Sequence, residues 1–216
     1  MPRDRRATVD SWAMSLMHSA LLTRIYERAW RPAVVRALST LTYAAEDAIV
    51  DRHLERRSHL RLLDLCCGTA RTSRHWIPRH ADVLGIDLSL AMLREARRRT
   101  PSERLVLVQA DAGSPIAQAG TFDAAFCFAA LHLLERPENV LSAAAEALRP
   151  HGLFFAWVAT SSGRMRAGPV QRLTRALGLL LWEPKQLMVR LVAHGFEIRE
   201  IQSFGAIEFA VAQLLQ

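Results

Sequence analysis

Short apolar runs alternate with amphipathic segments through the middle of the chain. A short apolar run between turn residues is typical of a buried strand, whereas apolar positions spaced three and four residues apart indicate a helix. Strands that alternate with helices indicate a parallel sheet covered on both faces. The predicted strands are 60–65, 81–88, 104–111, 121–131 and 153–160, and the helices between them include 90–99 and 137–151.

The C-terminal part of the chain departs from this alternation. A helical pattern over 183–195 is followed by two apolar stretches, 196–204 and 206–214, which only Gly205 separates. A connection this short cannot form a parallel crossover, so the two stretches form an antiparallel hairpin. The prediction is an α/β fold with a seven-stranded, mostly parallel sheet, one antiparallel C-terminal strand and helices on both faces.

Helical periodicity also precedes the first strand. Apolar residues recur at helical spacing over 14–25, and a second helical stretch covers 31–54, with Pro32 well placed for a helix start. No repeat or clear linker interrupts the chain. We therefore expect one compact domain, with an N-terminal helical extension or lid in residues 1–56 and the ligand-binding sheet in 57–216.

Composition narrows the class of protein. Half of the 216 residues are apolar and 23% are charged, which suffices for a full core. The net charge is +7, but its source is 27 Arg and one Lys spread along the chain rather than one basic stripe. No apolar run approaches the 18 residues of a membrane span. We expect a cytoplasmic protein with no nucleic-acid partner and no stable membrane insertion; the oligomeric state stays open.

The three cysteines do not have the spacing of a metal site. Cys66 and Cys67 are adjacent, so their Cα atoms lie about 3.8 Å apart, below the usual range for a disulfide. Cys127 lies in an apolar run. A zinc site needs about four ligands at spacings such as CxxC, which the chain does not offer. We therefore expect small buried thiols in a reducing compartment, and no bound metal.

Three acidic residues follow successive predicted strands. Asp64 ends the first apolar run, Asp87 ends the second and Asp111 ends the third. The carboxyl ends of parallel strands form a ligand-binding crevice, where an acid at the second strand accepts hydrogen bonds from ribose hydroxyls. The turn after Asp64 has one glycine, Gly68, in place of the GxGxxG that cradles a pyrophosphate. A nucleoside without phosphates fits this turn better than a dinucleotide.

Motifs in this order resemble the class I S-adenosylmethionine (SAM)-dependent methyltransferases, small-molecule type, with their Rossmann-like fold. The resemblance covers roughly residues 60–213 and rests on LLDLCCGTA, VLGIDLS, VQADA, FDAAFCFAALHLL and HGFEIREIQSFGAIEFAVA. The first motif usually resembles DxGCGTG, and this chain departs from it at Cys66 and Ala70. The resemblance implies SAM as cofactor and a methyltransferase, EC 2.1.1.-.

The resemblance also implies roles for individual residues. Asp64, Cys66 and Gly68 would hold the methionine part of SAM, and Asp87 would bind the ribose. Leu88 and Met92 would pack on the adenine, whose edge Asp111 and the Ala112 N–H would read, and Phe128 would face the sulfonium.

The acceptor is less determined than the cofactor. SAM carries its own leaving group, so a base is needed only for a weakly nucleophilic acceptor. His132 is the best-placed base candidate, followed by His18 and Tyr26. The chain lacks the [D/N]PP[F/Y/W] motif of nucleic-acid amino methyltransferases and the acidic triplet of magnesium-dependent catechol enzymes. We expect direct in-line transfer to a small, rather apolar organic molecule.

Two segments outside the sheet pattern are expected to close a lid over the acceptor. They are the N-terminal helix, about 8–30, and residues 161–184, and their predicted pocket residues are Trp12, Met17, Tyr26, Met165, Leu177 and Trp182. Three alternatives stay open: a protein of this fold without methyl transfer (a cyclase or a binding protein), a lipid or quinone methyltransferase at the membrane surface, and a nicotinamide oxidoreductase. The missing GxGxxG and the terminal hairpin argue against the last.

Overall fold

The computed structural model describes Ala29 and residues 31–54, 59–115, 117–166, 168 and 181–215. Its seven strands form one sheet in the order β3-β2-β1-β4-β5-β7-β6. They are β1 (Arg61–Leu65), β2 (Asp82–Asp87), β3 (Leu105–Gln109), β4 (Phe122–Phe128), β5 (Leu148–Ala159), β6 (Phe196–Phe204) and β7 (Ile207–Leu214). All neighbours pair in parallel except β7, which is antiparallel to both β5 and β6. The predicted seven-stranded sheet with one reversed strand is confirmed.

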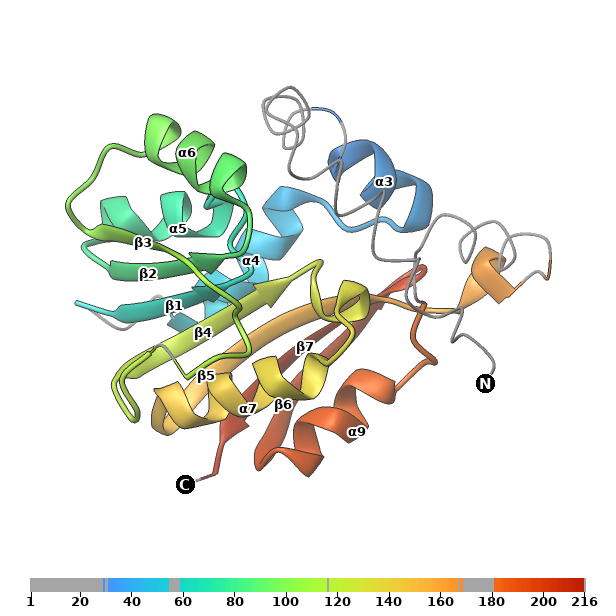
Figure 1. The fold of residues 1–216 in the computed structure, drawn as a ribbon. Coiled ribbons are helices and arrows are strands. Elements are labelled where there is room, and N and C mark those ends of the chain that lie inside the picture. The colour runs from blue at the N-terminus through green and yellow to red at the C-terminus, as the bar shows by residue number, and fades with distance from the viewer. Residues whose placement is uncertain are drawn as a thin grey trace, which may run out of the picture.

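Helices cover both faces of this sheet, as Figure 1 shows. They are α3 (Arg31–Leu38), α4 (Tyr43–Leu54), α5 (Arg71–Trp76), α6 (Leu90–Arg99), α7 (Pro137–Ala147) and α9 (Gln186–Ala193). Short 3₁₀ turns lie at η3 (Ile77–Arg79), η4 (Leu131–Leu133) and η5 (Gly163–Arg166). Buried residues of α7 and α9 pack on one face, and those of α3, α4, α5 and α6 pack on the other.

Two predicted helices have different bounds in the structure. The stretch 31–54 is two helices, because Thr42 breaks it: its hydroxyl accepts a hydrogen bond from Ala45 N–H at 3.1 Å and caps α4. The helix predicted to run to residue 151 ends at Ala147, and Leu148–Gly152 begin β5. Pro150 explains this end, because proline disfavours the helix interior and pushes the residue before it into extended backbone.

The helices before the sheet are part of its core. Ile49, Val50 and Leu54 of α4 are at most 4% exposed and belong to the same apolar cluster as Phe155 and Trp157 of β5. Residues 31–54 therefore pack on the sheet. The boundary near residue 56 between an extension and the sheet stays a prediction.

Candidate functional site

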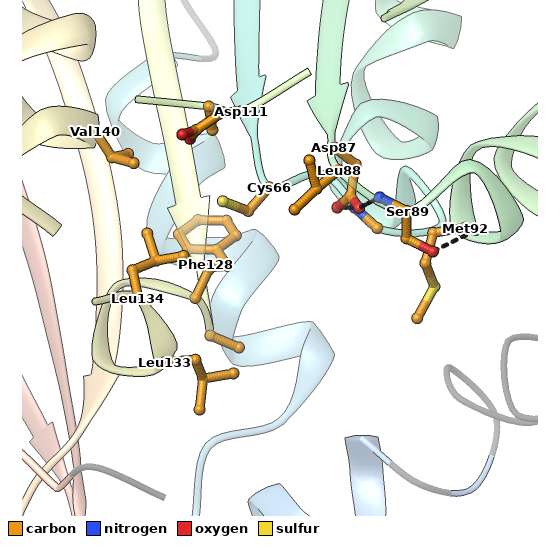
Figure 2. Close-up of a pocket in the computed structure, with 14 residues that line it drawn as sticks. Cys66, Asp87, Leu88, Ser89, Met92, Asp111, Phe128, Leu133, Leu134 and Val140 are labelled. Carbon is orange, nitrogen blue, oxygen red and sulfur yellow. Dashed lines mark hydrogen bonds between the residues drawn. The ribbon is translucent and has the colours of Figure 1, made fainter. Parts of the chain in front are cut away.

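The carboxyl ends of β1, β2 and β4 border a crevice, open to solvent, that contains about 850 Å³ of empty space (Figure 2). Eight of the nine predicted cofactor residues line it, and Asp64 is the exception. Its lining also includes residues that sequence reasoning did not select. The full set is Cys66, Gly68, Asp87, Leu88, Ser89, Met92, Asp111, Ala112, Phe128, Ala129, Ala130, Leu133, Leu134 and Val140. The crevice brings together eight of the residues predicted to share it, whereas Asp64 lines the adjoining space beneath the turn.

The turn between β1 and α5 passes through left-handed backbone three times. Cys66, Gly68 and Ala70 have φ angles of 57°, 54° and 54°. Only glycine adopts this region without steric cost, yet two of the three positions are not glycine. Hydrogen bonds hold the turn in place: Cys67 N–H donates to Ile86 O at 3.0 Å and Ala70 N–H donates to Cys67 O at 2.9 Å.

Asp87 connects this turn to the end of β2. Its Oδ2 accepts from Gly68 N–H and its Oδ1 accepts from Ser89 N–H, both at 2.8 Å. Ser89 in turn caps α6, because its hydroxyl accepts from Met92 N–H at 3.3 Å. A carboxylate has about four lone-pair sites, so these two bonds leave acceptor capacity toward the cavity.

Apolar side chains form two opposite walls of the cavity. Leu88 and Met92 lie on one side, and Leu133, Leu134 and Val140 lie on the other (Figure 2). Leu88 is 51% exposed although it is a large apolar residue. A flat aromatic ring bound between these walls would remove the exposed apolar surface of Leu88 from water.

Asp111 lies at the edge of the cavity and is exposed. Its Oδ1 accepts a hydrogen bond from Gly113 N–H at 2.9 Å, so this side chain also stabilises a turn. The second carboxylate oxygen would be the acceptor for a base edge. Glycine is needed at position 113 because a Cβ there would lie only 2.7 Å from Asn139 Cβ.

Asp64 is buried beneath the turn and lines an adjoining cavity of about 440 Å³. Its Oδ2 accepts a hydrogen bond from the Ser73 hydroxyl at 2.7 Å. Burial raises its pKa from 3.8 to about 7, against the opposing effect of that hydrogen bond; the nearby charges of Asp87 and Glu46 raise it further. A buried carboxyl of this kind gains from a cation placed beside it.

The three thiols have different surroundings. Cys66 lines the cavity, while Cys67 is buried against Gly85, where a Cβ would lie 3.1 Å from its Sγ. A hydrogen bond with Cys127, together with burial, raises the pKa of the Cys66 thiol well above its ordinary value. Cys66 is therefore a neutral, space-filling group at neutral pH rather than a nucleophile.

The family is given by a comparison with protein-family models. Residues 63–156 match the model described as a methyltransferase domain. The matched residues include the carboxyl end of β1, the three left-handed positions, Asp87, Asp111 and Phe128. Residues 63–156 are a methyltransferase domain of the class I, SAM-dependent family. SAM is the cofactor of this class, and the class number is EC 2.1.1.-.

Curated relatives share part of this methyltransferase. Over 97 residues, 45% of the chain, it is 34% identical to a malonyl-[acyl-carrier protein] O-methyltransferase of Salmonella typhimurium. Over 81 residues, 38% of the chain, it is 37% identical to a demethylmenaquinone methyltransferase of a Parafrankia species. These matches span 38% and 26% of the two relatives. The chain thus covers well under two thirds of either relative's length.

Solved structures share the fold of the methyltransferase over most of its length. A phosphoethanolamine N-methyltransferase 2 of Haemonchus contortus superimposes with a TM-score of 0.72 at 16% identity, covering 81% of this chain and 53% of that one. The [4+2]-cyclase SpnF superimposes with a TM-score of 0.67 at 20% identity, covering 78% of this chain and 79% of that one. At these identities the likeness establishes the fold alone.

His132, the first base candidate of this methyltransferase, is buried in η4 and is not among the residues that line the cavities. Its ring stacks on Trp157 with centroids 6.3 Å apart, and its Nδ1 has no hydrogen-bond partner among the described residues. Burial lowers its pKa to about 4. The imidazole is neutral at pH 7, and a group with this pKa is a weak base, so its surroundings do not favour the base role.

The predicted acceptor residues fall mostly outside the described part of the methyltransferase. Trp12, Met17, His18, Tyr26 and Leu177 lie outside the described residues. Met165 lies in η5 and is half-buried. Trp182 is 7% exposed in the core against α9, with the Arg190 guanidinium 4.7 Å from its ring centroid. The acceptor roles of these residues stay predictions.

Sequence reasoning missed a buried ionic cluster beside Asp64. Glu46 of α4 is 2% exposed and accepts hydrogen bonds at 2.8 Å from Arg31, Arg71 and the Trp157 indole N–H. Both guanidinium groups lie over the Tyr43 ring, at 4.6 and 4.4 Å. Arg31, Glu46 and Arg71 come from helices, where a charged residue usually indicates a solvent-exposed face. The one signal in the sequence for this cluster was Trp157, a polar-edged aromatic residue near the end of a buried strand.

Proposed function

We propose that this chain transfers the methyl group of SAM directly, in line, to a small and rather apolar organic molecule. The main support is the crevice at the strand ends. There Asp87 accepts a hydrogen bond from the turn after β1, and Leu88, in one of two opposed apolar walls, is half exposed. SAM supplies the activated methyl and its own leaving group. The protein's part is to bind, to orient and to exclude water.

The chain's residues fit the parts of SAM in order along the crevice. Asp87 would accept hydrogen bonds from both ribose hydroxyls, and Leu88, Met92, Asp111 and Ala112 would hold the adenine. Asp64, with Cys66 and Gly68, would hold the methionine part, whose ammonium group favours the ionised carboxyl. Phe128 ends β4 and lines both cavities, so it would border the reacting methyl.

The two relatives do not decide the acceptor, because one is a malonyl-[acyl-carrier protein] O-methyltransferase and the other a demethylmenaquinone methyltransferase. The second relative favours a quinone acceptor at a membrane surface as the second candidate. Among the described residues, none of the helices has the length and hydropathy of a membrane span.

Calorimetry with S-adenosylhomocysteine tests the cofactor site, with Asp87→Asn as the variant and Asp82→Asn as the matched control on the same strand. We expect micromolar affinity that is lost only in the first variant. Incubation with methyl-labelled SAM and a cell extract, followed by mass spectrometry of labelled products, tests the transfer. Tight binding without label in any product would favour a cyclase or a binding protein instead.

A further inference from the structure

Another cavity, called the second cavity below, adjoins the Asp64 cavity on the side away from the cofactor crevice. It has a volume of about 500 Å³ and lies between α3, α4 and the end of β5. Arg31 borders both this cavity and the one at Asp64. The Asp64 cavity shares Cys66, Gly68 and Phe128 with the cofactor crevice. The three spaces thus follow one another, with the Asp64 cavity in the middle.

The side of the second cavity nearest the cofactor is hydrogen-bonded and electrically balanced. Glu46 holds the Trp157 indole and the Arg31 guanidinium through hydrogen bonds of 2.8 Å each. Arg71 adds a second positive charge. The carboxylates of Glu46 and Asp47 balance the two guanidinium groups: Arg31 pairs with Glu46, and Arg71 pairs with both. Arg31 and Glu46 line this end of the cavity, and Arg71 and Asp47 lie behind them in the same ionic cluster, so the charges there balance.

The other end of the cavity is different. Arg36 lines it, is exposed, and makes no ion pair among the described residues. The neighbouring lining is apolar: Pro32, Val35 and Leu41. Arg36 follows Arg31 by five residues on the same helix, so the two Cα atoms lie about 7.5 Å apart along its axis. An unbalanced positive charge therefore stands at the end of an apolar space remote from the cofactor.

We propose that this second cavity holds the methyl acceptor, and that the acceptor is an apolar molecule with one anionic group, bound by Arg36. The reacting atom then lies at the opposite end of the acceptor, near Arg31, where the second cavity borders the Asp64 cavity, and the anionic group is not the site of methylation. The assignment of the cavity to the acceptor rests on the proposed function, whereas its preference for an apolar anion rests on its own lining.

Two fluorescent probes with the same aromatic body test this preference. 8-Anilinonaphthalene-1-sulfonate carries a negative charge, and N-phenyl-1-naphthylamine lacks it. Arg36→Gln removes the charge at the cavity, and Arg94→Gln removes an equal charge from an exposed site on α6 outside the three cavities. Val35→Trp fills the cavity itself. Titrations are made with the full chain in the presence of S-adenosylhomocysteine.

We expect the anionic probe to bind the unmodified protein more tightly than the neutral probe. Arg36→Gln should raise the dissociation constant of the anionic probe about tenfold, the usual effect of losing a hydrogen bond to a charged group. The same variant should leave the neutral probe unchanged, and Arg94→Gln should change neither. Val35→Trp should weaken both probes while S-adenosylhomocysteine still binds.

The proposal would be overturned if the ratio of the anionic to the neutral probe's dissociation constant were the same in Arg36→Gln as in the unmodified protein. Undiminished binding of both probes to Val35→Trp would also overturn it. These results concern the second cavity alone. Failure of the unmodified protein to bind S-adenosylhomocysteine would instead overturn the proposed function, so the two failures are told apart by one calorimetric titration.

Discussion

Replacement of Asp64 by Asn should remove a stability cost that the ligand-free protein carries at neutral and alkaline pH. The pKa of this carboxyl is raised from 3.8 to about 7, chiefly by burial. The folded state therefore binds more protons than the unfolded state between these values, and the free energy of unfolding falls as pH rises through that range. At about 1.4 kcal/mol for each pH unit, the full cost at pH 8 is about 4 kcal/mol.

Asn can keep the local contacts, because its Oδ1 accepts from the Ser73 hydroxyl that now donates to Asp64 at 2.7 Å. Urea unfolding of both proteins from pH 4 to pH 8 measures the effect. The stability of Asp64→Asn relative to the unmodified protein should rise by about 4 kcal/mol across this range. Asp82→Asn is the control, since Asp82 is 64% exposed in the same sheet. A stability difference that stays constant with pH would refute the reasoning.

If Asp64 holds the methionine part of SAM as proposed, the same carboxyl should couple SAM binding to pH. A cationic ligand favours the ionised form of Asp64, so binding should release a proton near pH 6.5 and weaken as pH falls below 7. Calorimetry in two buffers with different ionisation enthalpies counts the protons released. Equal apparent enthalpies in both buffers would show that Asp64 does not change its charge on binding.

Three further results are expected. Asp87→Ala should weaken S-adenosylhomocysteine binding by more than tenfold, because each charge-assisted hydrogen bond to a ribose hydroxyl is worth about 1.5–3 kcal/mol; unchanged affinity in calorimetry would contradict the ribose role. Glu46→Gln should lower the free energy of unfolding by about 3–5 kcal/mol, because it leaves two half-buried guanidinium groups without their shared partner, whereas the exposed Glu103→Gln should change it little; urea unfolding that gave the same value for both variants would count against the ionic cluster. Deletion of residues 1–20 should spare S-adenosylhomocysteine binding and abolish methyl transfer, and a truncated protein with the full transfer rate would exclude this segment from the acceptor site.

The sheet could be predicted because its signal is local. Five apolar runs, the helices between them and the one-residue connection at Gly205 fix the strand count and the reversed strand through short-range rules. The same rules placed Asp87 and Asp111 at one edge, since parallel strands end together. The helix ends were less predictable, because single residues decide them: Thr42 by capping α4, and Pro150 by ending α7.

The buried ionic cluster could not be predicted in the same way. Glu46, Arg31 and Arg71 come from three different helices, and nothing in the spacing of charged residues along a chain shows which of them will be buried together. Their contacts depend on how α3, α4 and α5 pack around Trp157. A helical Glu usually faces solvent, and Glu46 is an exception only because three donors converge on it.

The left-handed positions after β1 affect the conformational entropy that the loop loses when a ligand binds. A glycine-rich loop has many conformations in the unfolded chain and keeps some of that freedom after folding. Cys66 and Ala70 restrict the same loop with side chains, at some steric cost in the folded state. Less motion then has to be frozen out when a ligand enters, so the association would carry a smaller entropic penalty than in relatives with glycine at both positions.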